Sequence, residues 1–153
     1  FVTESDNYNR LCHAAALLSD IGWTEHPDYR ALHSFIRVLR LPISGVTHRQ
    51  RIMLALAVFV RYNGKRKQYE VQQVRDLLGK KDQHRASVMG VALRMAHSLS
   101  GGVPGILPRT ALNMSNSKLI LKVDESSRVL IGNSVEKIFH DLADTLDVKG
   151  KIE

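Results

Sequence analysis

The sequence predicts a mainly α fold, in which a helical bundle is followed by a small α+β tail. Apolar residues recur at helical spacing through the first hundred residues, whereas short strand-like runs occur only beyond them. Between the two, residues 101–108 hold three of the ten glycines and two of the four prolines, a composition typical of a linker. We therefore expect a helical domain over residues 1–102 and a small β-rich tail with one helix over residues 103–153.

Two helices are expected in the first part of the chain. Residues 8–21 carry a broad apolar face at helical spacing, and the following Gly22 is a residue type that commonly ends a helix. A second helix should start at Pro27–Asp28, since proline is tolerated in a first helical turn. The segment 41–45 contains Pro42 and should end that helix.

Three more helices are expected before the linker. Thr47 and Gln50 have the spacing of a capping box, which predicts a helix start. The helix that follows is apolar all round from Ile52 to Val60, so it should lie at the centre of the bundle. Two further helices fit residues 68–78 and 83–99, each with glycine shortly after its end.

The tail is expected to contain three strands and a helix. Residues 111–114 and 119–123 predict two strands joined by a turn at residues 115–117. Residues 128–131 predict a third strand. Asn133 or Ser134 is then expected to cap a last helix, whose apolar residues recur at helical spacing.

Composition excludes several classes of protein. A chain with 44% apolar residues, 24% charged residues and only four prolines is neither disordered nor fibrous. The single cysteine, Cys12, excludes an internal disulfide framework and a cysteine-rich zinc site, and it suits a reducing cytoplasm. The longest apolar run, Ile52–Val60, is far shorter than the roughly 20 residues that cross a bilayer. With no signal peptide at its start, the chain is expected to be cytoplasmic, and its first residue, Phe1, suggests a piece of a longer polypeptide.

The net charge of +7 is unevenly distributed along the chain. Residues 1–29 carry one basic residue against five acids, and residues 30–94 carry fourteen basic residues against three acids. Residues 95–153 carry seven of each and sum to zero. A block of one sign attracts polyanions, and nucleic acid, an acidic protein, an anionic membrane or polyphosphate would each fit the charge alone.

The basic residues of this block are expected to line or flank a route for a polyanion, because arginine suits bidentate phosphate contacts and lysine suits point-charge contacts. They are Arg30, Arg37, Arg40, Arg61, Lys65, Arg66, Lys67, Lys80, Lys81 and Arg85. Only 6% of the residues are aromatic, so base stacking is poorly supported. A partner with phosphates but no bases fits better.

Histidine and aspartate residues suggest a different kind of site. His13 and Asp20 lie two helical turns apart, so both should project from the same side of the first helix. His33 falls on the second predicted helix and His97 on the fifth, and helical metal-dependent phosphohydrolases gather such side chains in one cavity. The adjacent His-Asp pair of those enzymes is missing, because Ser19 precedes Asp20. A typical metal site is therefore not expected.

Five short motifs in order resemble the C-terminal region of the Ppx/GppA family of exopolyphosphatases and guanosine pentaphosphate phosphohydrolases, and the similarity runs from the first motif to the chain end. The motifs are L-C-H-A-A-A-L-L-S-D-I-G at residues 11–22, H-S-F-I at 33–36, L-P-I-S-G at 41–45, the helix 54–62 ending in V-R-Y, and A-L-R-M-A at 92–96.

The resemblance implies a helical domain with an HD-phosphohydrolase-like fold, followed by a small terminal subdomain. It places catalysis in an N-terminal actin-like module with glycine-rich phosphate loops and magnesium, none of which this sequence contains. Ser19 and Asn63 stand where the family often has histidine. The expected HD-like cavity is therefore degenerate, with no catalytic residue and no metal ligand set; its members would be His13, Asp20, His33, Asn63 and His97.

The leading hypothesis is a polyanion-binding and regulatory domain of a bacterial hydrolase that acts on polyphosphate or on guanosine pentaphosphate, a stringent-response nucleotide. The N-terminal phosphatase module would be its partner in the same chain, with a homodimer possible and no membrane involved. The first alternative is a self-contained metal phosphohydrolase that uses His13, Asp20, His33 and His97. The second is a helical domain that binds nucleic acid.

Overall fold

The computed structural model describes residues 6–65 and 67–153, which form two compact units. One unit, here called the helical unit, ends at Leu93, and the other, the β unit, begins at Arg94. The division falls inside the long helix α5 (Lys80–Ser100). The domain boundary expected at residue 102 stays a prediction.

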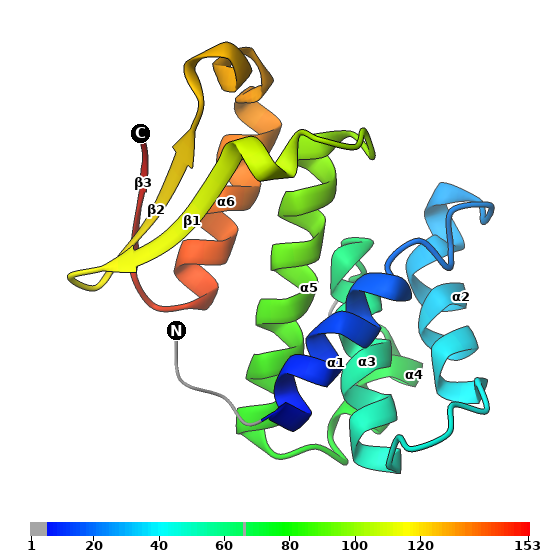
Figure 1. Cartoon of the computed structure of the whole chain (residues 1–153). Helices are drawn as coiled ribbons and strands as arrows, with labels where there is room; N and C mark the ends of the chain where they lie inside the picture. Colours follow the sequence, from blue (N-terminus) through cyan, green and yellow to red (C-terminus); the bar gives the residue numbers. More distant parts are fainter. Residues whose placement is uncertain (1–5, 66) are drawn as a thin grey trace. The chain divides into compact units, whose positions relative to one another are not determined.

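The helical unit is built around α3 (His48–Arg61), as the sequence predicts. Every residue from Met53 to Phe59 is buried, and Phe59 meets Phe35 of α2 edge to face at 5.8 Å between ring centroids. The remaining helices of this unit are α1 (Asp6–Leu17), α2 (Pro27–Arg40), α4 (Tyr69–Arg75) and the first part of α5 (Figure 1).

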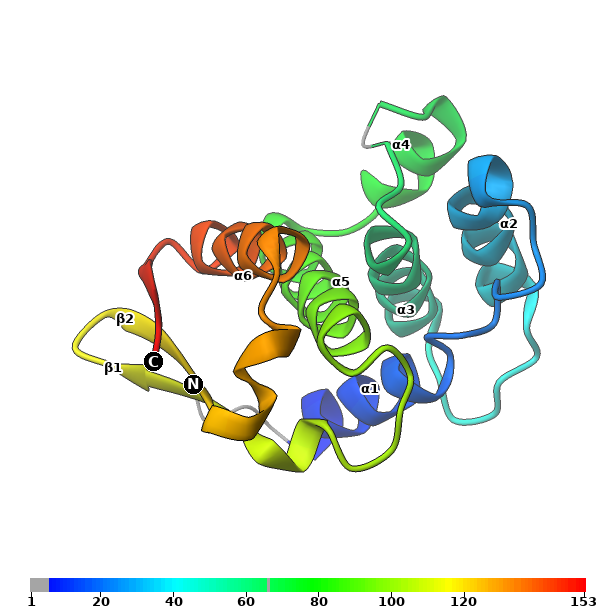
Figure 2. The same ribbon diagram turned by 90° about the horizontal axis from the view of Figure 1, so that it is seen from above.

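Local signals at the helix starts are confirmed. The Thr47 amide donates to Gln50 Oε1 at 2.9 Å, and the Gln50 amide donates to Thr47 Oγ1 at 3.3 Å, which completes the capping box of α3. Pro27 occupies the first turn of α2, where its missing N–H costs nothing. Figure 2 shows the same helices from above.

The first helix is shorter than predicted, because α1 ends at Leu17 rather than at residue 21. Residues 18–25 continue as a chain of turns, in which the amides of Ile21 and Trp23 each bond the carbonyl three residues earlier. Asp20 therefore lies beyond α1, and the expected placement of His13 and Asp20 on one helix is wrong. Tertiary contacts of this loop, described below, hold it in the non-helical path.

The β unit contains a three-stranded sheet in the order β1-β2-β3, with β1 (Thr110–Ser115), β2 (Lys118–Val123) and β3 (Lys149–Ile152). The β1–β2 pair is antiparallel, as the predicted hairpin requires, and β2 pairs with β3 in parallel. Helix α6 (Asn133–Thr145) provides the return that a parallel pairing needs (Figure 1). The prediction of a mainly α fold with a small α+β tail is confirmed.

Two details of the tail differ from expectation. The predicted strand at 128–131 is wrong, because residues 125–130 form the 3₁₀ helix η2 (Glu125–Leu130), in which Val129 is 87% exposed. The third strand, β3, carries one large apolar residue in four, so hydrophobic periodicity does not reveal it. Helix α6 begins after Gly132 without a side-chain cap, so the expected cap by Asn133 or Ser134 is also wrong.

Candidate functional site

One end of the helical unit gathers basic side chains from several helices. The starts of α1, α3 and α5 and the end of α2 are at this end, with α3 between α2 and α5 (Figures 1 and 2). Arg10 Nη2 donates to the Gly45 carbonyl at 3.2 Å, and the Arg85 guanidinium lies 5.1 Å from the ring of Tyr8. These contacts join α1 to the α2–α3 loop and to α5. We call this surface the basic end; its residues are Arg10, Arg40, Arg49, Lys80, Lys81 and Arg85.

The basic end has unneutralised positive charge. Arg40, Lys80 and Lys81 are exposed, and within the described part of the chain no hydrogen bond or ion pair engages their side chains. The nearby carboxylate of Asp82 is buried and accepts a short hydrogen bond from Arg49 Nε, which raises the pKa of Arg49. Lys80 and Lys81 also occupy the first turn of α5, where the helix dipole is positive and disfavours cations. An anion bound here would relieve both effects.

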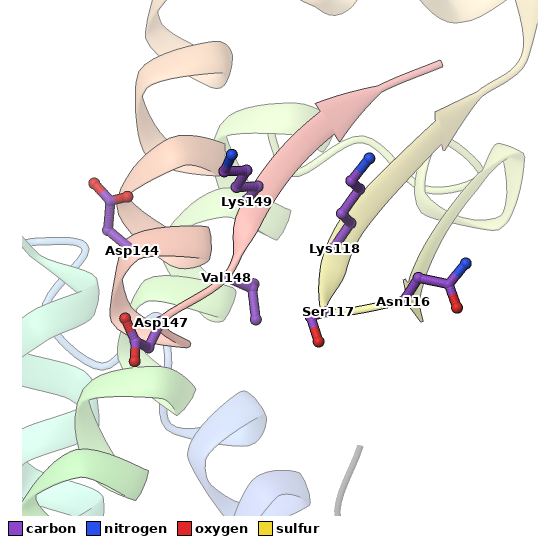
Figure 3. A pocket seen from close by; sticks show the side chains of 7 residues that line it. All are labelled: Asn116, Ser117, Lys118, Asp144, Asp147, Val148 and Lys149. Carbon is purple, nitrogen blue, oxygen red and sulfur yellow. The ribbon is translucent and has the colours of Figure 1, made fainter.

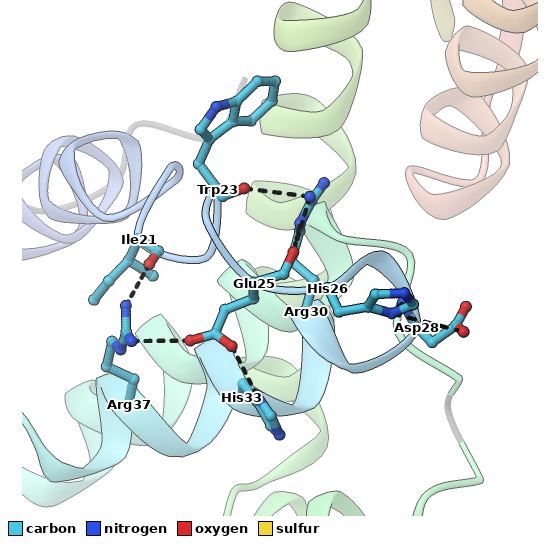
Figure 4. Close-up of polar contacts among 8 residues, drawn as sticks. All are labelled: Ile21, Trp23, Glu25, His26, Asp28, Arg30, His33 and Arg37. Carbon is cyan, nitrogen blue, oxygen red and sulfur yellow. Dashed lines mark hydrogen bonds and ion pairs between the residues drawn. The ribbon is translucent and has the colours of Figure 1, made fainter.

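Two predicted polyanion ligands on α2, Arg30 and Arg37, hold the α1–α2 loop (Figure 4). Arg30 donates to the backbone carbonyls of Trp23 and Glu25 at 3.0–3.2 Å. Arg37 donates to the Ile21 carbonyl at 2.8 Å and to the Glu25 carboxylate at 2.9 Å. These bonds satisfy the backbone of a loop that has no regular structure of its own.

The same loop carries a carboxylate with a perturbed pKa. His33 Nδ1 lies 2.9 Å from Glu25 Oε2, and Arg37 binds the other carboxylate oxygen (Figure 4). The hydrogen bond with His33, aided by the positive charges of His33 and Arg37, lowers the pKa of Glu25. His33, expected in the HD-like cavity, thus bonds a loop carboxylate.

Arg61, the last residue of α3, is the most deeply buried of the predicted basic ligands that the structure describes. Its guanidinium donates to Asp20 Oδ1 at 2.8 Å and lies 4.2 Å from the ring of Tyr62. Its side chain is 7% exposed, against 62% for Asp20. The Tyr62 hydroxyl accepts a hydrogen bond from the Gly22 amide at 3.2 Å, and burial raises the pKa of Tyr62. A guanidinium therefore occupies the side of Asp20 that faces the protein.

The members of the expected HD-like cavity come from different elements of the fold. His13 is exposed on α1, Asp20 lies in the loop, and Asn63 is exposed after α3 with a left-handed backbone at φ 57°. His97 belongs to the β unit, and the others to the helical unit. Among the described residues, no three His, Cys, Asp or Glu side chains are placed to hold one metal ion.

The other predicted basic ligands lie elsewhere. Lys65 and Lys67 are exposed in the segment that follows α3, away from the basic end. Arg66 lies outside the described residues. The nine described ligands thus form no single cluster: Arg30, Arg37 and Arg61 make internal contacts, whereas Arg40, Lys80, Lys81 and Arg85 lie at one end of the helical unit.

A hollow in the β unit was not predicted from the sequence (Figure 3). It lies between the β1–β2 turn and the end of α6, and its lining includes the lysines Lys118 and Lys149 and the acids Asp144 and Asp147. Sequence reasoning missed it because its residues come from two distant segments. The pairing of β2 with β3, which brings Lys118 beside Lys149, has no local signal.

Comparison with known proteins identifies the family. A family model described as exopolyphosphatase, C-terminal, matches residues 1–151, and no curated protein matches the chain. Among the described residues, no helix is long and apolar enough to cross a membrane. The match confirms the resemblance drawn from the five motifs and covers almost the whole sequence. The chain therefore belongs to the exopolyphosphatase C-terminal family.

Proposed function

We propose that this chain is the polyanion-binding domain of an exopolyphosphatase, and that its basic end receives the phosphate chain of inorganic polyphosphate. Hydrolysis would take place on a separate N-terminal module, whose magnesium would be held by residues outside this sequence. A cytoplasmic location and a bacterial host are part of the same proposal. Family membership supports the hydrolase context, and the charge distribution supports the binding role.

The observation that carries the proposal is the basic end. Exposed cations of α2 and of α5 lie at this end of the helical unit, and the buried carboxylate of Asp82 is already engaged by Arg49. Arg40 offers a planar fork for bidentate phosphate contacts, and Lys80 and Lys81 offer point charges. Such groups bind phosphates but do not hydrolyse the phosphoanhydride bonds between them. The expected role is therefore capture and positioning of a substrate.

A charge-matched set of double variants tests the proposal. K80Q/K81Q removes two charges from the basic end, and R128Q/K137Q removes two exposed charges from the β unit. Affinity for long-chain polyphosphate is measured by titration at several salt concentrations. By analogy with single-stranded nucleic acids, each lost contact reduces the salt slope by about 0.7, which is about a fivefold loss at 0.1 M salt. Equal affinities of the two variants would refute the proposal.

Two further experiments test another basic segment and other ligands. K65Q/K67Q neutralises the exposed lysines after α3 and shows whether that segment also contacts the polymer. Guanosine pentaphosphate and a single-stranded oligonucleotide serve as competitors. Polyphosphate is expected to bind most tightly, because aromatic stacking platforms are scarce in this sequence. A preference for the oligonucleotide would favour the nucleic-acid alternative.

No observation favours the metal-dependent alternative. It requires Asp20 as a ligand, but the carboxylate of Asp20 pairs with Arg61 at 2.8 Å. His13 and His33 also make no common site with Asp20 in the described part of the chain. We therefore retain binding as the proposed role of this domain.

A further inference from the structure

The sheet of the β unit has one covered face and one open face. Side chains on the covered face, such as Leu119 and Leu121, are buried, and a Cβ at Gly150 would lie 2.7 Å from the ring of Phe139 in α6. Helix α6 therefore covers this face (Figure 1). The alternation of strand residues and the register place the following on the open face: Ala111, Asn113, Ser115, Lys118, Ile120, Lys122, Lys149 and Lys151.

Four lysines on this face are close neighbours. Lys118 lies directly beside Lys149 in the parallel register, and Lys151 lies beside Ile120. Neighbouring strands are about 4.8 Å apart, so the first pair places two like charges side by side (Figure 3). Like charges directly opposite one another destabilise a sheet. The four exposed lysines thus form a surface on which a bound anion would relieve repulsion.

Glu153 offsets only part of this charge. Its Oε1 lies 2.6 Å from Lys151 Nζ, and the pKa of Glu153 is lowered mainly by that hydrogen bond, with a smaller effect from Lys122. None of the eight register positions on the open face holds an acid. The β unit nevertheless has equal numbers of acids and bases beyond residue 94. Its acids lie mostly on α6, η2 and the adjoining turns. Two of them, Asp144 and Asp147, line the hollow that Lys118 and Lys149 also line, but neither occupies a strand position of the open face.

We propose that this open face, here called the lysine face (Lys118, Lys122, Lys149 and Lys151), is a second binding surface for linear polyphosphate. The proposal rests on the proposed function, which makes polyphosphate the ligand of the domain. No aromatic side chain occupies the open face, whereas proteins that bind RNA on a sheet stack bases on aromatics. Lysine ammonium groups suit a flexible polymer with a charge on every phosphate.

The test compares K118Q/K149Q with R128Q/K137Q in the 153-residue chain. Both double variants remove two exposed positive charges from the β unit, so they change the general attraction for polyanions equally. For long-chain polyphosphate we expect K118Q/K149Q to lose about fivefold in affinity per lysine at 0.1 M salt, with a salt slope reduced by about 0.7 per contact. The control should lose much less. Thermal unfolding verifies the fold, and K118Q/K149Q should unfold no earlier than the wild type because it loses a repulsive pair.

A variant that is expected to raise the affinity, rather than lower it, provides a second test. Glu153→Gln releases Lys151 from its ion pair, so it should raise polyphosphate affinity, whereas Lys151→Gln should lower it less than Lys118→Gln. If the wild type does not bind polyphosphate, the proposed function fails. If K80Q/K81Q weakens binding but K118Q/K149Q matches R128Q/K137Q, only the lysine face is refuted. Tighter binding of single-stranded RNA than of polyphosphate to this face would overturn its ligand assignment.

Discussion

The ion pair between Asp20 and Arg61 should contribute to the stability of the helical unit, although Asp20 is largely exposed. Replacement of Asp20 by alanine leaves a guanidinium whose side chain is 7% exposed without its carboxylate. Exposed ion pairs contribute about 0.2–1 kcal/mol, and loss of one partner of a fully buried pair costs about 3–5 kcal/mol. Because only Arg61 is buried, we expect Asp20→Ala to lower the free energy of unfolding by about 1–2 kcal/mol.

Arg61→Met supplies the second side of a double-mutant cycle. Methionine keeps an apolar side chain in the buried position and removes the positive charge that Asp20 neutralises. It also removes the cation–π contact of the guanidinium with the Tyr62 ring at 4.2 Å. In the Arg61→Met background, Asp20→Ala should therefore have little effect. The expected coupling energy is about 1 kcal/mol, within the range for residues in direct contact.

Urea unfolding followed by tryptophan fluorescence is the assay. Trp23 is the single tryptophan and lies in the helical unit, so its signal reports on that unit. With a urea dependence of about 2 kcal/mol per M, the expected loss moves the midpoint by about 0.5–1 M. An Asp20→Ala midpoint equal to that of the wild type, or an equal effect of Asp20→Ala in both backgrounds, would refute the reasoning.

Two further predictions concern packing and pH. Gly90→Ala should destabilise the helical unit by about 1–3 kcal/mol, because the new Cβ would lie 2.5 Å from a backbone oxygen of α3 and 2.5 Å from Val60 Cβ. Gly79→Ala serves as the control: its Cβ would meet nothing within 4 Å, so stability against urea should change little. Because the hydrogen bond with His33 lowers the folded-state pKa of Glu25 below 4.5, the wild type should be more stable than Glu25→Gln at pH 6, and this advantage should shrink as the pH falls below about 4.5. An advantage that persists at pH 3 in urea unfolding would contradict the second prediction.

Much of the local structure was readable from the sequence. The capping box of Thr47 and Gln50, the proline in the first turn of α2 and the all-apolar run of α3 each act within a few residues. The β1–β2 hairpin is predictable for the same reason, since its turn and both strands are contiguous. Short-range hydrogen bonds and burial decide these elements, and sequence patterns report them directly.

The end of α1 was decided by tertiary contacts. A helix to residue 21 satisfies the apolar pattern, but Arg37 binds the Ile21 carbonyl and Tyr62 binds the Gly22 amide. Both partners lie far along the chain, so no local pattern shows them. The contact with Ile21 also holds the guanidinium of Arg37 against the loop, although the side chain is 48% exposed.

The sequence by itself determined the family, the helical core and the total charge of each segment. Only the tertiary structure decided which charges are exposed and can contact a ligand. Arg61 is buried against Asp20, whereas Lys80 and Lys81 stay exposed. In the tail, equal numbers of acids and bases suggest a neutral surface, but the parallel pairing of β3 places Lys149 beside Lys118 on one face. The physical reason is that electrostatic energy depends on distance in space, and only the fold converts sequence separation into distance.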